Sequence, residues 1–223
     1  MSNVRKVMLV TNEIYHVFTR SIEGFEVFRS RNSFRRFIRG MEYYNQSQPK
    51  QRLSDYLQLS PKAKEEPDNI LTKDPLVRII AYCLMPTHIH IALKQIKDGG
   101  ISTFMSKTLN SFTRFFNIAH KRRGPLWESK FKNVLVDTDE QLLHLVRYIH
   151  LNPSSAGLVT KPEEWQFSSY CESIGQKSET GLCSWEGIIN INTSDYRKFV
   201  HSRIAYQRGL SKIKRLLIDN YTG

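Results

Sequence analysis

Two histidines, His88 and His90, stand two positions apart in a run of otherwise apolar residues. On a β-strand this spacing places both imidazoles on one face, while Ile89 and Ile91 face a core on the other. Neutral imidazole is the commonest nitrogen ligand for a metal, so the pair could hold a divalent ion. The simpler interpretation is two histidines on the solvated side of a half-buried strand. The pair therefore needs a partner before it indicates a site.

A helix predicted after Thr138 offers that partner, because His144, Tyr148 and Asn152 recur in it every four residues. This spacing places the three side chains in one polar stripe. Asn152 can offer its carbonyl oxygen as a further metal ligand, and Tyr148, one turn earlier, can act as a nucleophile. A free phenol has a pKa of about 10 and attacks poorly unless the phosphate is polarised. In the structural alternative, Tyr148 packs on the sheet and Asn152 caps the helix.

The chain of 223 residues is basic, with 33 Lys and Arg against 21 Asp and Glu and a formal net charge of +12. This surplus favours a polyanionic partner, nucleic acid first, because cations placed on phosphates release condensed counterions. We expect the DNA to follow one cluster: His120, Lys121, Arg122, Arg123, Lys130 and Lys132. An ordinary solvated helix end whose cations complement the dipole is the alternative. His16, like His120, is expected to be structural or to contact phosphate.

Hydrophobic periodicity predicts elements in the order β-α-β-β-α-β-α. The strands are expected at 14–20, 76–84, 87–94 and 131–136, and the helices from Asn32, over 101–119, and from Thr138 to near Pro153. This order predicts an α+β, ferredoxin-like fold, a split βαβ antiparallel sheet with helices on one face. We expect one domain over 1–160, with a polar insertion at 45–75 and a short helix at 55–59. Residues 161–223 form a C-terminal extension, predicted to be helical and basic.

No apolar run approaches the roughly 18 residues that a membrane span requires. The three cysteines, Cys83, Cys171 and Cys183, fit neither a CxxC pattern nor a paired secretory framework. We therefore expect a cytoplasmic protein with no membrane partner. A zinc hydrolase of the barrel amidohydrolase type is disfavoured, because the HxH pair lies in mid-chain and eight βα units are absent.

Four segments, in this order, resemble those of the HUH single-tyrosine transposases, and most of all the REP-associated tyrosine transposases. They are YCLMPTHIH at 82–90, GPLWESKF at 124–131, RYIHLNP at 147–153 and WQFSSY at 165–170. The resemblance implies that Tyr148 is the nucleophile, that His88 and His90 are metal ligands, and that Asn152 is the third ligand. It also implies that the ion is Mg²⁺ or Mn²⁺.

The reaction that the resemblance implies is attack of Tyr148 on a phosphodiester of single-stranded or hairpin DNA. It leaves a 5′-phosphotyrosyl enzyme and a free 3′-hydroxyl, and needs no ATP. The protein would act as a monomer or a homodimer. The chain departs from the family pattern at His150, where relatives commonly have Glu, and in its longer insertion. A catalytically silent DNA-binding relative is the alternative function.

Overall fold

The computed structural model describes residues 8–66, 74–176 and 180–219, without the side chains of 212–219. At its centre lies a four-stranded sheet in the order β2-β3-β1-β4. The strands are β1 (Ile14–Arg20), β2 (Val77–Met85), β3 (His88–Gln95) and β4 (Lys132–Val136). β3 lies between β1 and β2 and is antiparallel to both, which is the split βαβ arrangement. The predicted α+β, ferredoxin-like sheet is confirmed.

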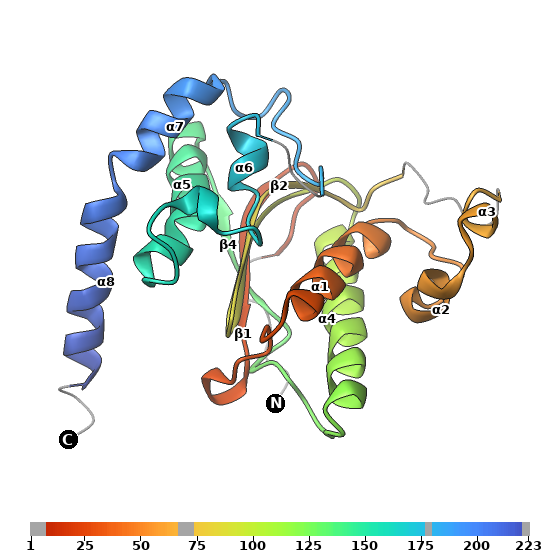
Figure 1. The fold of residues 1–223 in the computed structure, drawn as a ribbon. Helices are drawn as coiled ribbons and strands as arrows, with labels where there is room; N and C mark the ends of the chain where they lie inside the picture. The colour runs from red at the N-terminus through yellow and green to blue at the C-terminus, as the bar shows by residue number, and fades with distance from the viewer. Residues whose placement is uncertain (1–7, 67–73, 177–179, 220–223) are drawn as a thin grey trace.

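Two helices, α1 (Arg31–Tyr44) and α4 (Gly100–Ala119), cover one face of this sheet (Figure 1). Ser30 begins α1 in a capping box with Ser33. Both helices carry apolar residues at the three- and four-residue spacing that the sequence indicated. From α4 the buried residues of this core are Ile101, Phe104, Met105, Leu109, Phe112 and Phe116.

A third long helix, α5 (Asp139–Ser155), covers the opposite face, where Figure 1 shows it across the sheet from α1 and α4. The expectation of helices on one face therefore holds for the two crossover helices and is wrong for α5. The physical reason is that β2 buries side chains on both faces, so each face needs a cover. The residues of this second core include Ile80, Ala81, Cys83, Ala92, Leu142, Val146 and Ile149.

Both ends of α5 lie close to where the sequence predicts them. Thr138 begins the helix as expected, and its side chain accepts a hydrogen bond from the Gln141 amide at 3.1 Å. The helix ends at Ser155, two residues after Pro153, which agrees with the predicted stop near Pro153. A proline lacks only its own N–H, and the last turn is held by Ala156 N–H donating to the Asn152 carbonyl at 2.9 Å.

The remaining helices are short or lie towards the C-terminus. They are α2 (Leu53–Gln58), α3 (Pro61–Lys64), α6 (Tyr170–Ser173), α7 (Thr193–His201) and α8 (Ile204–Asp219), with 3-10 turns at Ile22–Gly24 and Pro162–Glu164. The predicted helical extension is thus present on the α5 side of the molecule (Figure 1). Residues 177–179 and 220–223 of the predicted extension lie outside the described residues.

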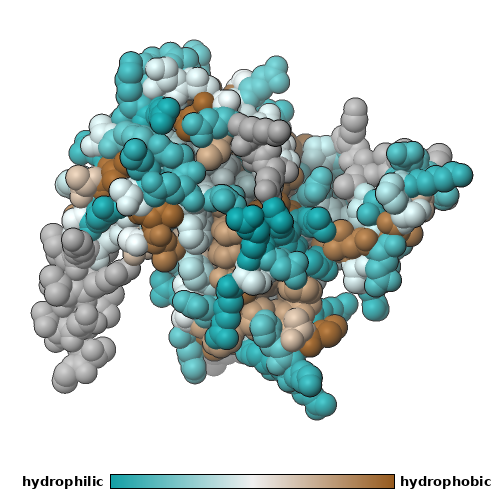
Figure 2. Space-filling view, in the orientation of Figure 1, coloured by the Kyte–Doolittle hydropathy of each residue, from teal (hydrophilic) through white to brown (hydrophobic). Residues whose placement is uncertain are grey.

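The segment before α6 packs directly on the sheet, although the domain boundary at residue 160 stays a prediction. The Trp165 indole N–H donates to the Leu84 carbonyl at 3.0 Å, and the Leu84 amide donates to the Phe167 carbonyl at 2.9 Å. Figure 2 shows hydrophilic residues over most of the visible surface, with smaller hydrophobic patches between them. Within the described ranges, no helix combines the length and apolar character needed to cross a membrane.

Candidate active site

β3 presents its two histidines towards α5, as the strand alternation predicts. Ile89, Ile91 and Leu93 lie in the core on the α1 and α4 side, whereas His88 and His90 point to the other face. The two imidazoles are neighbours, with ring centroids 5.1 Å apart and planes nearly perpendicular. The pair is therefore placed to converge on one point.

Tyr148 of α5 faces this pair. Its ring centroid lies 5.5 Å from that of His90, and the side chain is 41% exposed. A cavity of about 320 Å³ opens between the two elements and is lined by Phe18, Thr19, Arg20, His88, Ile89, His90, Glu128, Ser129, Lys132 and Tyr148. The structure thus brings the predicted nucleophile and both predicted histidines to one cavity.

Asn152 stands one helical turn from Tyr148, outside the residues that line the cavity. Its side-chain amide donates to the Tyr148 backbone carbonyl at 2.8 Å. His144, the first residue of the predicted stripe, turns instead to α7, where its ring packs edge-on against Phe199. The stripe therefore contributes Tyr148 to the site and has Asn152 beside it.

Both histidines are held in the neutral form. Burial lowers the pKa of His88 to about 4, helped by the nearby charge of Arg20. Burial also lowers the pKa of His90 well below 6.5, and the neighbouring His88 and His16 add to the effect. At neutral pH each imidazole is uncharged and keeps one nitrogen with a free lone pair, which is the form that binds metal ions.

The hydrogen bonds of the pair leave the same ring nitrogen available on each histidine. His88 Nδ1 lies 2.9 Å from Thr87 Oγ1, and His90 Nδ1 lies 3.0 Å from His16 Nε2. In the tautomer that donates from Nδ1, the lone pair stands on Nε2. A hydrogen bond on the remote nitrogen is how proteins orient metal-binding histidines. The donor set thus fits a divalent ion at the two Nε2 atoms.

His16 was missed as a site residue, since a lone histidine on a strand gave no such signal. The pairing of β1 with β3 places its ring 5.2 Å from that of His90, stacked at 24°. Burial lowers the pKa of His16 to about 4, so it too is neutral. The structure places it against His90, which agrees with the structural role that was one of the two expectations, and a phosphate contact stays a prediction. Only the register of the two strands could have revealed it.

Arg20 and Glu128 were also missed. Arg20 ends β1 directly opposite His88, and both charged side chains line the cavity. Arg20 influences the pKa of His88, His90 and Tyr148, which places its charge near all three. Glu128 lies in the GPLWESKF segment at 124–131, for which the sequence predicted no individual site residue other than Lys130.

The six predicted DNA-binding residues separate in space. Lys132 lines the cavity with Tyr148, and Lys130 lines a different cavity beside α4. Arg122 donates to the Asn117 side-chain oxygen at 3.0 Å and to the Pro125 carbonyl at 2.7 Å, so it braces the loop after α4. His120 packs on Phe116, while Lys121 and Arg123 are exposed. A DNA-binding role for these residues stays a prediction.

The Tyr148 phenol is a weak nucleophile in its protonated form. Burial raises the pKa of its phenol, and the Asn152 side chain partly opposes the shift by hydrogen bonding. The phenol is therefore protonated at neutral pH, and an attack by its oxygen must be accompanied by loss of that proton.

His150 of α5 is fully buried and joins this helix to the C-terminal segment. Its Nδ1 lies 2.6 Å from the Tyr196 hydroxyl of α7, and its Nε2 lies 2.8 Å from Ser169 Oγ. Burial lowers the pKa of His150 to about 3. The histidine is thus a neutral link in a hydrogen-bond network between α5 and the C-terminal segment.

This network predicts a dependence of stability on pH. Between about 3 and 6.5 the unfolded chain binds a proton at His150 that the folded chain does not, so stability is complete above 6.5 and falls as pH drops. The contribution is about 1.4 kcal/mol per pH unit at most. Thermal unfolding of wild type and His150→Gln between pH 7.5 and 5 should give a shallower slope for the variant. Equal slopes would contradict the assignment.

The fold and the site define a class of protein: a ferredoxin-like sheet with a paired-histidine strand, faced by a tyrosine on a separate helix. No protein-family model matches the chain. A Haemophilus influenzae protein named as a REP-associated tyrosine transposase is 26% identical over 118 residues, and the match covers 48% of this chain and 66% of that protein.

A solved structure with a similar fold is that of a REP-associated tyrosine transposase bound to a REP hairpin. The TM-score is 0.50 at 17% identity, and the superposition covers 82% of this chain and 89% of that chain. Both relatives carry the name that the four motifs pointed to, so the resemblance to REP-associated tyrosine transposases is confirmed in sequence and in fold.

Proposed function

We propose that this chain is a metal-dependent, single-stranded DNA endonuclease and transposase that cleaves and rejoins DNA through a 5′-phosphotyrosine intermediate. One observation carries the proposal: Tyr148 meets His88 and His90 at a single cavity, which Arg20 and Lys132 also line. A phenol, two neutral imidazoles and two cations are a donor set suited to a phosphodiester. The similarity to REP-associated tyrosine transposases supports hairpin, REP-like DNA as the substrate.

His88 and His90 would hold the ion through their Nε2 atoms, and Asn152 would be the third ligand. Among the described residues no group of three or more His, Cys, Asp or Glu side chains is arranged to hold a metal. We propose a ligand set of the two histidines and the Asn152 amide oxygen, which would suit Mg²⁺ or Mn²⁺ when substrate phosphate oxygens supply further ligands. When bound, such an ion polarises the phosphodiester and stabilises its developing charge.

Side chains of the cavity bind the phosphate and supply the nucleophile. Arg20 and Lys132 bind the phosphate, since both cations line the cavity beside Tyr148. Tyr148 Oη forms a bond to phosphorus while the bond from phosphorus to the 3′ oxygen breaks. The phenol gives up its proton and the departing 3′ oxygen takes one up, so the charge balances. The phosphotyrosyl ester keeps the energy of the original linkage, and a later 3′-hydroxyl can reverse the step without ATP.

The test is formation of a covalent adduct by the full chain. Purified protein is incubated with a labelled oligonucleotide that carries a REP-like hairpin and a single-stranded flank, in Mn²⁺ or in EDTA. We expect a labelled band that survives denaturation in Mn²⁺, is absent in EDTA, and maps by mass spectrometry to the peptide containing Tyr148. Hairpin binding with no adduct under any metal condition would support the catalytically silent alternative instead.

A further inference from the structure

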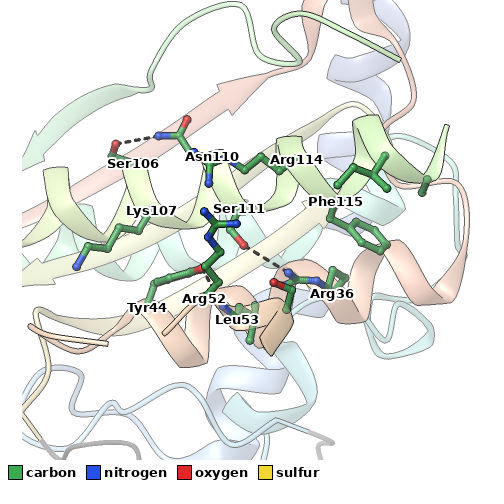
Figure 3. A pocket seen from close by; sticks show the side chains of 13 residues that line it. Arg36, Tyr44, Arg52, Leu53, Ser106, Lys107, Asn110, Ser111, Arg114 and Phe115 are labelled. Carbon is green, nitrogen blue, oxygen red and sulfur yellow. Dashed lines mark hydrogen bonds between the residues drawn. The ribbon is translucent and has the colours of Figure 1, made fainter. Parts of the chain in front are cut away.

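A second cavity lies far from the histidines, on the outer side of the layer that α1 and α4 form. Its volume is about 520 Å³. Figure 3 shows α4 and α1 as its walls, with Arg52 and Leu53 of the insertion closing it from below. The Tyr148 site opens on the sheet face that α5 covers, so the two cavities occupy opposite faces of the sheet.

The charge of this cavity is of one sign. Four cations line it, Arg36, Arg52, Lys107 and Arg114, and none of its lining residues is acidic. Within the described residues, the ion pairs involve other side chains and none of these four. Four cations without a carboxylate repel one another, and an anionic ligand would relieve that repulsion.

Arg36 is the most confined of the four. Its guanidinium donates to Ser111 Oγ at 3.4 Å and lies 5.4 Å from the centre of the Phe115 ring (Figure 3). Burial, followed by the neighbouring charge of Arg39, lowers the pKa of Arg36. A half-buried guanidinium that points at a hydroxyl retains unused donors for phosphate oxygens.

The other lining groups suit the rest of a nucleotide chain. Ser106, Asn110 and Ser111 offer hydroxyl and amide groups along α4, while Tyr44, Leu53 and Phe115 add apolar surface. Phosphate contacts by cations and neutral donors, with apolar contact to sugars and bases, are the pattern of single-stranded nucleic-acid sites.

The part of the insertion at residues 51–53 builds one side of this cavity and is held in place by contacts with α1. Leu53 is buried with Tyr43 and Tyr44, and its amide donates to the Tyr44 hydroxyl at 3.3 Å. The Tyr43 hydroxyl donates to the Gln51 carbonyl at 2.8 Å. Arg52 is thus held at the cavity by contacts on both sides. A polar insertion that sequence alone left without a role acquires one here.

We propose that this cavity is a second DNA-backbone site, which binds phosphates of the strand outside the segment that reaches Tyr148. The proposal rests on the proposed function for the identity of the DNA and adds a place that holds it. The insertion would then strengthen binding to longer DNA without taking part in cleavage. A short oligonucleotide that occupies only the Tyr148 cavity would not depend on it.

The experiment compares Arg52→Gln, Arg114→Gln and the double variant with Arg203→Gln, which removes an exposed arginine on the α5 side. Fluorescence anisotropy measures the affinity for the hairpin oligonucleotide with its flank from 50 to 200 mM salt. We expect each cavity substitution to weaken binding about threefold or more, and to reduce the slope of log affinity against log salt by about 1. The control should keep the wild-type slope.

Two outcomes would overturn the proposal: wild-type affinity and salt slope in the double variant, or an equal loss in Arg203→Gln. Circular dichroism and the melting temperature confirm that each variant folds. Adduct formation with a short oligonucleotide is measured in parallel and should stay at the wild-type rate in the cavity variants. If adduct formation fails in all proteins but the salt slopes differ, the proposed chemistry is wrong and the second site stands.

Discussion

Tyr148→Phe is expected to abolish the covalent adduct and to lower strand cleavage by at least about a thousandfold, because the attacking oxygen is gone. The ring remains, so its contacts with His90 and His16 are preserved. Affinity for hairpin DNA should change little, since the cations that line the cavity are untouched. Cleavage gels and anisotropy on the same preparation separate the two effects.

Tyr206→Phe is the matched control, because Tyr206 is also exposed, at 57%, but lies on α8 outside the cavity. It should form the adduct at the wild-type rate. An adduct that persists in Tyr148→Phe would show that another group is the nucleophile. Loss of the adduct in both variants would show that the loss does not depend on the position of the tyrosine, and it would not support Tyr148 as the nucleophile.

The sequence predicted the elements well where periodicity was strong. β1 has the expected bounds, and the order of strands and helices followed from alternating and helical patterns. The face covered by α5 was harder to predict, because an apolar strand buried on both sides has no polar face to mark its orientation. Pro153 marked the end of α5 to within two residues, and the last turn of the helix tolerates the loss of its N–H.

In the candidate site too, residues placed by local periodicity were predicted, whereas residues placed by strand pairing were not. The sequence predicted that His88, His90 and Tyr148 share a site because each lies at a spacing that the periodicity of its own element explains, and the structure brings them to one cavity. His16 and Arg20 were missed because their places depend on which strand pairs with β3 and in which register. Register is a property of two segments 70 residues or so apart, and neither segment contains it alone. Asn152 lies near the site through its helix, but its role as a ligand stays a prediction.

His88→Ala is expected to weaken Mn²⁺ binding by at least about a hundredfold and to remove cleavage at ordinary metal concentrations, since one of two imidazole ligands is lost. His88 is the first residue of β3 and is only partly buried, so the fold should survive. Titration calorimetry with Mn²⁺ alone measures the affinity without DNA or turnover. Near wild-type binding in His88→Ala would remove the histidine pair from the metal site.

Substitutions of His16, followed by the same Mn²⁺ titration, test whether its hydrogen bond to His90 orients the His90 ring for metal binding. His16→Ala removes the partner of His90 Nδ1 but no ligand, so Mn²⁺ affinity should fall by about tenfold to a hundredfold. His16→Gln should recover part of that loss, because its amide oxygen can accept the hydrogen bond from Nδ1. A purely structural role would move the melting temperature in both variants and leave the Mn²⁺ affinity of the folded protein unchanged. An intermediate affinity in His16→Ala, restored in part by Gln, would instead mean that strand β1 sets the nitrogen with which His90 faces the metal.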